Sequence, residues 1–547
     1  MAVSGDSVLV RSLIAKNITR IWQKNGFLGA KNITEVGFYT VGRLGKKGRV
    51  GVRAALQVGL EDVKKLEGNF VFDVVSEGEL KEKGFLRMRK TKQVCTIGPA
   101  CCSVEDLEKL AAGGMNVARL NMCHNTREWH LDVINKIRRL NEENGFCVSV
   151  MIDTEGSQIH VVDHGAPSTV KAEEGSVWLF TAEQFDGLRP FTVQANYEGS
   201  LKVLKWVIYL LLMVEWQALS DHNLDFSIFN SKLFKHEGQK DWADIEFGIS
   251  EGVDFISLSF VNNADSISEV KNYLSTKSSR CIRVLAKIES LESLQKLEEI
   301  VEASDGIMVA RGDLGVEVPL EQIPTVQEEI TRVCRELNKP VIVASQLLES
   351  MVEYPTPTRA EVADVSEAVR QFADALMLSG ESAIGSYGQK ALAVLRMASS
   401  RMELWSREEN KHILHQRQLG VSLPDRIAEQ ICNCAVEMAN NLGVDAIFVY
   451  TKYGHMASLL SRNRPCPPIF AFTNDSDTRM ALNLQWGVIP LLVDLSDDME
   501  GNISRTMDLM KTKGMVKPRD VVLLVSDLIP TIPNSSAFQA IQVKKVD

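Results

Sequence analysis

Polar side chains that can hold a metal ion or a phosphoryl group recur directly after short apolar runs of this sequence. Lys287 and Glu289 follow one run, Asp313 follows the next, and Arg119 closes an earlier one. Carboxylates from consecutive runs suit a shared divalent cation with oxygen ligands, and Lys287 and Arg119 could hold a phosphoryl group. Phosphoryl transfer depends on positioning and charge stabilisation, so these residue types fit it. The other polar residues after such runs are Asn121, Asp153, Thr154, Arg311, Ser345, Gln346, Ser379 and Glu381.

Each of these residues also has a structural interpretation. A single carboxylate after a strand usually caps the next helix or pairs with a neighbouring base, and Lys287 alone could be a solvated charge. The functional interpretation therefore depends on the residues meeting at one place. The turn before Leu314 could add backbone N–H groups for an anion. This region has no Walker A loop and no G-x-G-x-x-G fingerprint, so a nucleotide would be bound in another way.

The runs themselves predict the elements that position these side chains. Eight of them lack strict polar alternation, as buried parallel strands do, and helical apolar spacing lies between them. Eight such strands close a (β/α)8 barrel, whose C-terminal strand ends converge on one mouth. The predicted strands are Gln93–Ile97, Asn116–Leu120, Cys147–Ile152, Val253–Phe260, Ile282–Ala286, Gly306–Ala310, Pro340–Ala344 and Asp374–Leu378.

Three segments fall outside this barrel, which we place at residues 91–158 and 241–405. About a hundred residues follow the third strand, too many for a simple connection, and predict an inserted lid domain at residues 159–240. Residues 420–547 show a second strand–helix series and predict a C-terminal α/β domain. Residues 1–90 form a basic N-terminal extension.

Composition limits the classes of protein. Lysine and arginine number 61 against 71 acidic residues, a net charge of −10, which argues against nucleic acid as the main partner. The longest apolar run, Trp206 to Val214, is about half the length of a membrane-spanning helix, so no membrane partner is expected. The first 60 residues carry ten Lys/Arg and only Asp6 and Glu35. That pattern resembles an organelle-targeting peptide, a plastid one included; the alternative is an uncleaved arm on a cytoplasmic protein.

At its motifs the sequence resembles the pyruvate kinases. The segments that carry the resemblance are TKQVCTIGPA (91–100), GMNVARLN (114–121), AKIES (286–290), SDGIMVARGDLGVEVP (304–319), KPVIVASQLLESM (339–351), PTPTRAE (355–361) and LMLSGESA (376–383). It implies a barrel, a lid inserted after the third strand and a C-terminal α/β domain. The implied reaction turns phosphoenolpyruvate and ADP into pyruvate and ATP, in a homo- or hetero-tetramer.

The resemblance also implies roles for the individual residues. Glu289 and Asp313 would hold Mg²⁺ (or Mn²⁺), and Lys287 would stabilise the phosphoryl group in flight. Arg119 would contact phosphate, and Ser345, in place of the family's threonine, would help to protonate the enolate. The remaining implied residues are Asn121, Asp153 and Thr154 for K⁺, Gly312 together with Asp313 for the substrate, and His124 and His160, with Arg119, for the nucleotide.

Several positions depart from the family pattern. Cys123 stands where a serine usually binds K⁺, and sulfur is a poor ligand for a hard cation. Asn125 replaces a glycine, Glu155 a lysine and His160 an arginine. A histidine cannot replace the charged, planar fork of that arginine, so we expect weaker nucleotide binding or a slow reaction.

The predicted lid departs further, since residues 201–240 lack the family's basic and glycine-rich segments. Either non-coding sequence has been read as coding, or the lid is truncated. Without a complete lid the reaction would slow. The C-terminal loop 451–454 resembles an effector-phosphate loop, but its surroundings give fructose-bisphosphate activation little support.

Three functions remain open at this point. The first is a pyruvate kinase, active or weakened; the second is a catalytically impaired subunit with a structural or regulatory role in a hetero-oligomer. The third, more distant, is a metal-dependent barrel aldolase acting on pyruvate enolate. Pyruvate formation that requires ADP would separate the first from the other two.

Overall fold

The computed structural model describes residues 89–156, 161–163, 179–181, 192–195, 239–409, 418–420, 422–496, 498–526 and 540–547. Residues 1–88 of the basic N-terminal extension and most of the predicted lid, His160 included, lie outside these residues. Within them, no helix is both long and apolar enough to cross a membrane.

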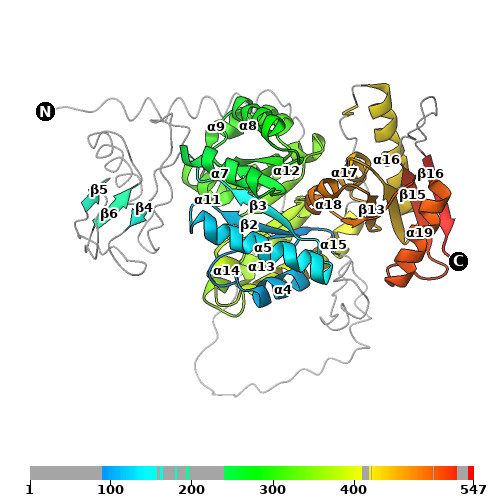
Figure 1. Ribbon diagram of the computed structural model, residues 1–547, viewed down its shortest axis with the longest axis horizontal. Coiled ribbons are helices and arrows are strands. Elements are labelled where there is room, and N and C mark those ends of the chain that lie inside the picture. The colour runs from blue at the N-terminus through cyan, green and yellow to red at the C-terminus, as the bar shows by residue number, and fades with distance from the viewer. Residues whose placement is uncertain are drawn as a thin grey trace, which may run out of the picture. The chain divides into compact units, whose positions relative to one another are not determined.

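Eight parallel strands close into a barrel, as predicted (Figure 1). Going round the barrel, the order is β1, β2, β3, β7, β8, β9, β10, β11, and every neighbouring pair is parallel. The strands are β1 (Lys92–Thr96), β2 (Val117–Asn121), β3 (Ser149–Asp153), β7 (Phe255–Leu258), β8 (Arg283–Ile288), β9 (Gly306–Ala310), β10 (Val341–Ala344) and β11 (Ala375–Leu378).

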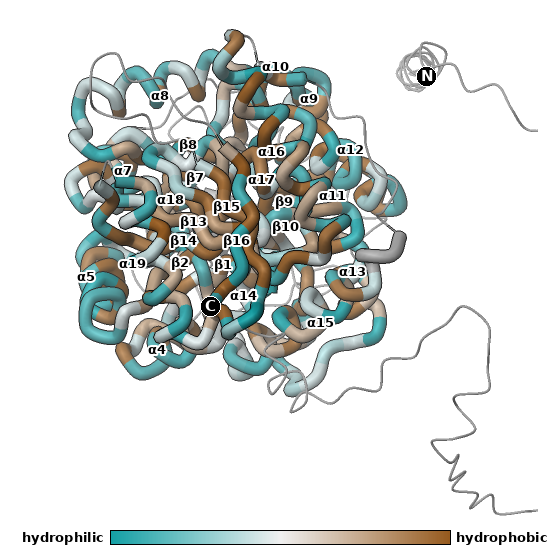
Figure 2. The backbone as a smooth tube through the Cα atoms, turned by 90° about the vertical axis from the view of Figure 1, so that its right-hand side faces the viewer, coloured by the Kyte–Doolittle hydropathy of each residue, from teal (hydrophilic) through white to brown (hydrophobic). Residues whose placement is uncertain are grey.

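Both faces of these strands are buried, which explains why they lack polar alternation. One face fills the barrel with side chains such as Val94, Met151 and Phe255. The other face, with Cys95 and Ile152 among others, packs against the surrounding helices. In Figure 2 the hydrophobic colour is concentrated on the strands, while helices such as α5 carry much hydrophilic colour.

Helices alternate with the strands, and several begin where the sequence provides a capping residue. Ser103 caps α4 by accepting a hydrogen bond from the Asp106 amide, and Thr358 and Glu361 form a reciprocal capping box on α13. The helical apolar spacing from Leu291 to Val301 belongs to two short helices, which meet at Lys296. The barrel helices are α4 (Val104–Gly113), α5 (Arg127–Asn144), α7 (Gln239–Ser250), α8 (Ala264–Lys277), α9 (Leu291–Gln295), α10 (Leu297–Ala303), α11 (Arg311–Glu317), α12 (Ile323–Glu336), α13 (Arg359–Arg370), α14 (Gly380–Ala383) and α15 (Gly388–Glu409), with 3-10 turns η2 (Leu320–Gln322) and η3 (Glu349–Val352).

The insertion after β3 contains three short described strands, β4 (Val161–Asp163), β5 (Leu179–Thr181) and β6 (Thr192–Ala195), paired in the order β4-β6-β5. The chain re-enters the barrel at α7, so the insertion follows the third strand as predicted.

The C-terminal residues form a five-stranded sheet in the order β14-β13-β12-β15-β16. Its last strand was not predicted, and it pairs antiparallel with β15. The elements are α16 (Leu423–Leu442), β12 (Ala446–Tyr450), α17 (His455–Arg462), β13 (Ile469–Thr473), α18 (Ser476–Ala481), η5 (Leu482–Leu484), β14 (Val488–Leu492), α19 (Met499–Thr512), β15 (Val521–Ser526) and β16 (Ala540–Lys545).

Candidate active site

Lys287 lies at the centre of a buried cluster at the carboxyl ends of the barrel strands. Its ammonium nitrogen is 2.6 Å from Oε1 of Glu289, 3.5 Å from Oδ1 of Asp153 and 3.0 Å from the Ser259 hydroxyl. Burial alone would lower the pKa of Lys287, but the carboxylates of Asp153, Glu289 and Asp313 raise it above its ordinary value. Lys287 therefore carries a fixed positive charge.

Arg119 holds the other side of Asp153. Its Nε and Nη2 lie 2.7 and 2.6 Å from Oδ2 of Asp153, and its Nη1 donates to Oγ1 of Thr96 at 2.9 Å. Burial would raise the pKa of Asp153, but Lys287 and Arg119 outweigh it and lower the pKa. The fully buried Asp153 is thus an anion that orients two cations.

Glu289 is fixed by a strained backbone turn. Oε2 accepts a 2.6 Å hydrogen bond from the amide of Phe260, which has a φ of 54°. Oε1 is buried, and no residue donates a well-directed hydrogen bond to it within the described chain, so its contact with Lys287 is an ion pair. Burial and the charge of Asp313 raise the pKa of Glu289 to about 8, against the effect of Lys287.

These features fit a divalent cation. Glu289 offers a buried carboxylate oxygen, paired with Lys287, within electrostatic reach of a second carboxylate, Asp313, in the first turn of α11. The described residues contain no cluster of three or more His, Cys, Asp or Glu side chains placed to hold a metal. Mg²⁺ commonly takes only one or two carboxylates and completes its shell with water and substrate phosphates. A dication here would also favour the charged form of Glu289.

Ser345 and Gly312 lie together on the adjacent strand ends. A β-carbon placed on Gly312 would be 3.6 Å from the Ser345 hydroxyl, so the two residues adjoin. Ser345 and Gln346 have φ of 71° and 55°, a conformation that non-glycine residues adopt at a cost. Arg311 supports it by donating to the Ser345 carbonyl oxygen at 2.6 Å while its guanidinium is bound by Asp364.

The loop after β2 carries the candidate ligands for potassium and nucleotide. Oδ1 of Asn121 accepts a 3.2 Å hydrogen bond from the Cys123 amide, and the His124 side chain is exposed. Burial and Asp153 raise the pKa of the Cys123 thiol to about 11, although Lys287 and Arg119 oppose them. Cys123 is therefore a neutral thiol beside the cluster.

Ser259 and Phe260 are site residues that the sequence analysis missed. The predicted strand ran to Phe260, but β7 ends at Leu258 because the backbone turns there. The next two residues therefore lie at the mouth, where Ser259 contacts Lys287 and the Phe260 amide binds Glu289. The polar Ser259, near the end of an apolar run, was the available signal.

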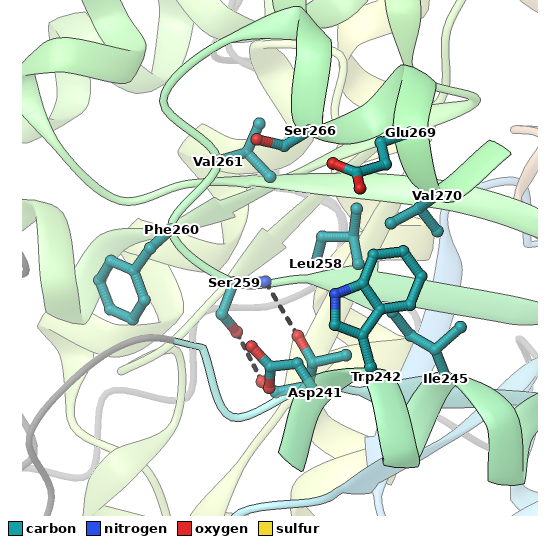
Figure 3. Close-up of a pocket in the computed structure, with 11 residues that line it drawn as sticks. Asp241, Trp242, Ile245, Leu258, Ser259, Phe260, Val261, Ser266, Glu269 and Val270 are labelled. Carbon is teal, nitrogen blue, oxygen red and sulfur yellow. Dashed lines mark hydrogen bonds between the residues drawn. The ribbon is translucent and has the colours of Figure 1, made fainter. Parts of the chain in front are cut away.

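A cavity of about 130 Å³ opens beside this turn. Figure 3 shows Trp242 and Asp241 of α7 facing Ser259, whose hydroxyl and amide are bonded to Thr154. Thr154 is buried and accepts from the Ser259 amide at 3.3 Å. The cavity and the Lys287 cluster therefore share the wall formed by Thr154 and Ser259.

Two of the strand-end residues have structural roles. Glu381 is fully buried, and its two carboxylate oxygens accept from the amides of Leu348 and Ser379 at 3.1 and 2.7 Å. Glu381 thus caps neighbouring backbone, the alternative considered for any single carboxylate. Glu155, which replaces a lysine in the family pattern, forms an ion pair with Lys240 at the start of α7.

The structure thus brings together Lys287, Arg119, Asp153, Thr154 and Glu289, with Asp313 within electrostatic reach. Ser345 adjoins Gly312, and Asn121 and His124 lie on the neighbouring loop. His160 lies outside the described residues.

Comparisons with known proteins identify the family of the chain. The model of the pyruvate kinase barrel domain matches residues 88–209 and 234–392, and that of the pyruvate kinase alpha/beta domain matches residues 429–536. Residues 210–233, within the segment that departs from the family pattern, remain unmatched.

Individual relatives are similar over most of their length. Pyruvate kinase isozyme A, chloroplastic, from Ricinus communis is 55% identical over 490 residues, covering 84% of each chain. Plastidial pyruvate kinase 3, chloroplastic, from Arabidopsis thaliana is 37% identical, covering 84% of this chain and 82% of the relative. A pyruvate kinase from Bacillus licheniformis is 35% identical, covering 81% and 78%. The chain belongs to the pyruvate kinase family.

Proposed function

We propose that Lys287, Glu289 and Asp313 carry the phosphoryl transfer of this pyruvate kinase, from phosphoenolpyruvate to ADP. The activity follows from family membership; the roles of the residues are our proposal. The observation that carries it is the buried Lys287 ammonium, set among the carboxylates of Asp153, Glu289 and Asp313.

In the proposed reaction, the bond from phosphorus to the enol oxygen breaks as a bond from an ADP phosphate oxygen to phosphorus forms. Lys287 and Arg119 face the negative charge on the transferred group, and Asp153 keeps both cations oriented. A divalent cation held by Glu289 and Asp313 would supply further positive charge. The enolate that leaves takes a proton with the help of Ser345, and pyruvate results.

A further part of the proposal concerns activation by K⁺. Asn121, Asp153 and Thr154 would supply oxygen ligands, but each carries a contact already: Asn121 with the Cys123 amide, Thr154 with Ser259, and Asp153 with its two cations. The Cys123 thiol adds a soft atom. We propose that K⁺ activates weakly here.

The test is pyruvate formation by the purified chain with and without ADP, Mg²⁺ and K⁺, beside a Lys287→Met control. The expected result is turnover that requires ADP and Mg²⁺ and is lost in the control. Turnover without ADP would favour the aldolase. Absence of turnover from folded protein that binds Mg²⁺ would favour the impaired subunit, which the changes at Cys123, Glu155 and His160 also suggest.

For assembly we propose a homo- or hetero-tetramer. Apolar side chains on α16, among them Leu423, Ile427 and Leu442, are exposed, and β16 is an edge strand of the C-terminal sheet within the described residues. Light scattering on the purified chain tests this, and a monomer at micromolar concentration would contradict it.

For location we propose a plastid. The basic N-terminal 60 residues and relatives whose names include "chloroplastic" support it. A fluorescent protein fused after residue 90 should enter plastids in plant cells; cytoplasmic fluorescence would support the uncleaved arm.

A further inference from the structure

The first turn of α5 points a buried histidine back at the loop before it. His130 is 1% exposed, and its Nε2 lies 2.8 Å from the backbone carbonyl oxygen of His124. A carbonyl oxygen only accepts, so Nε2 carries the proton and donates it. This hydrogen bond attaches the loop of residues 121–125 to α5.

The loop depends on such an attachment because its own geometry is costly. Asn125 has a φ of 64°, in the left-handed region that a β-carbon disfavours. Inside the loop, Asn121 accepts from the amides of Cys123 and His124 at 3.2 and 3.3 Å, long for such hydrogen bonds.

The other side of the His130 ring leaves it no alternative partner. Its Nδ1 is buried without a hydrogen bond, as is Oδ2 of Asp244, within the described residues. Arg127 binds Oδ1 of Asp244 at 2.8 Å, and Trp129 meets the His130 ring edge-on. Burial lowers the pKa of His130, so the ring is neutral and its single N–H is committed to His124.

The loop lies against the Lys287 cluster, because the Met122 amide donates to the backbone carbonyl oxygen of Asp153 at 2.9 Å. His124 lies in this loop and is exposed at the mouth. The Asp153 side chain holds Arg119 and Lys287 separately, so a shift confined to His124 and Asn125 would leave them in place.

We propose that His130 is a positioning residue, which fixes the loop bearing His124 for the binding of a nucleoside diphosphate. The inference rests on the proposed function, in which His124 contacts ADP. A displaced loop would weaken ADP binding and leave the handling of phosphoenolpyruvate nearly unchanged.

The test compares His130→Asn with His130→Gln. The glutamine amide nitrogen is four bonds from Cα, as is Nε2 of histidine, whereas the asparagine nitrogen is three bonds away and too short to reach the carbonyl. His130→Asn should raise the KM for ADP about three- to tenfold, with kcat and the KM for phosphoenolpyruvate changed less than twofold. His130→Gln should restore the KM for ADP to within about twofold of the wild type.

Equal KM values for ADP in the two variants would overturn the proposal, as would a fall in kcat alone or equal changes for both substrates. Should His130→Asn fail to fold by circular dichroism, His130→Phe takes its place, since its ring fills the buried site without an N–H. A wild type with no ADP-dependent turnover would instead refute the proposed function itself, before any variant is compared.

Discussion

The two ends of the barrel bury basic residues in opposite ways. At the carboxyl end, Lys287 faces three carboxylates and lies 2.6 Å from Oε1 of Glu289. At the amino end, Lys92 donates to the carbonyl oxygen of Val488, and Lys90 donates to those of Pro465 and Cys466 at 2.8 and 2.6 Å. These last three residues belong to the C-terminal domain.

The difference in partners distinguishes a buried lysine that serves the reaction, Lys287, from one that serves stability, Lys92. Burial lowers the pKa of Lys92 to about 7, since a carbonyl oxygen compensates a buried ammonium only in part. The carboxylates around Lys287 raise its pKa instead. Replacing residues at one end should therefore change catalysis, and replacing residues at the other should change stability.

The largest contrast is expected between Lys287→Met and Lys92→Met. Removing the Lys287 charge should lower kcat at least about a thousandfold, since it stabilises the transferred group. The fold should survive because Glu289, with a pKa raised to about 8, can take up a proton. Lys92→Met should keep kcat within about threefold, because its side chain lies at the far end of the barrel. Steady-state kinetics measures kcat of both variants, and circular dichroism checks that they fold. A large loss of kcat in Lys92→Met would contradict the assignment of Lys92 to stability alone.

Two buried glutamates at the carboxyl end, Glu289 and Glu381, allow a second comparison between a catalytic and a structural residue. Glu289→Gln should raise the Mg²⁺ concentration for half-maximal activity more than about tenfold, because a metal ligand loses its charge. Glu381→Gln is the matched control, since both oxygens of Glu381 bind backbone amides. It should lower the melting temperature and leave Mg²⁺ activation unchanged. Titration calorimetry with Mg²⁺ alone gives a readout independent of activity, and equal Mg²⁺ affinities in the two variants would remove Glu289 as a ligand.

At the amino end, the buried Lys92 should make the free energy of unfolding depend on pH. Between pH 7 and about 10.5 the unfolded chain keeps a proton on Lys92 that the folded chain has released. The free energy of unfolding of the wild type should therefore rise with pH in this window relative to Lys92→Met, by up to about 1.4 kcal/mol per pH unit. Urea denaturation at pH 7, 8 and 9 measures it. A constant difference between the two proteins would show that Lys92 has the same pKa in both states.

The smallest effect is expected at Cys123. Cys123→Ser replaces a neutral thiol by a hard oxygen ligand next to Asp153 and should increase activation by K⁺ about two- to fivefold. Activity titrated with KCl, against tetramethylammonium chloride at equal ionic strength, is the measurement. Superimposable K⁺ curves would refute the ligand argument for this position.

The barrel strands and the residues at their ends show how much of the structure the sequence could predict. Apolar runs predicted all eight barrel strands to within a few residues, because strands buried on both faces must be apolar throughout. Lys287, Glu289 and Asp153 then followed from their places after those runs. The strand β16 was missed because AIQVKK mixes apolar and charged residues, as an exposed edge strand does.

The sequence by itself determined the barrel, its insertion after the third strand and the residue types at the mouth, since these depend on local apolar patterns and chain order. Only the tertiary structure decided which strand-end groups act together. Glu289 and Glu381 look alike in sequence, yet one is ion-paired with a buried lysine and the other has both oxygens bound to backbone amides. Tertiary contacts likewise decided the roles of three further residues. A backbone turn brings Ser259 to Lys287 and Phe260 to Glu289, and the start of α5 brings His130 to His124. Burial and hydrogen-bond partners arise from such contacts, and no local pattern records them.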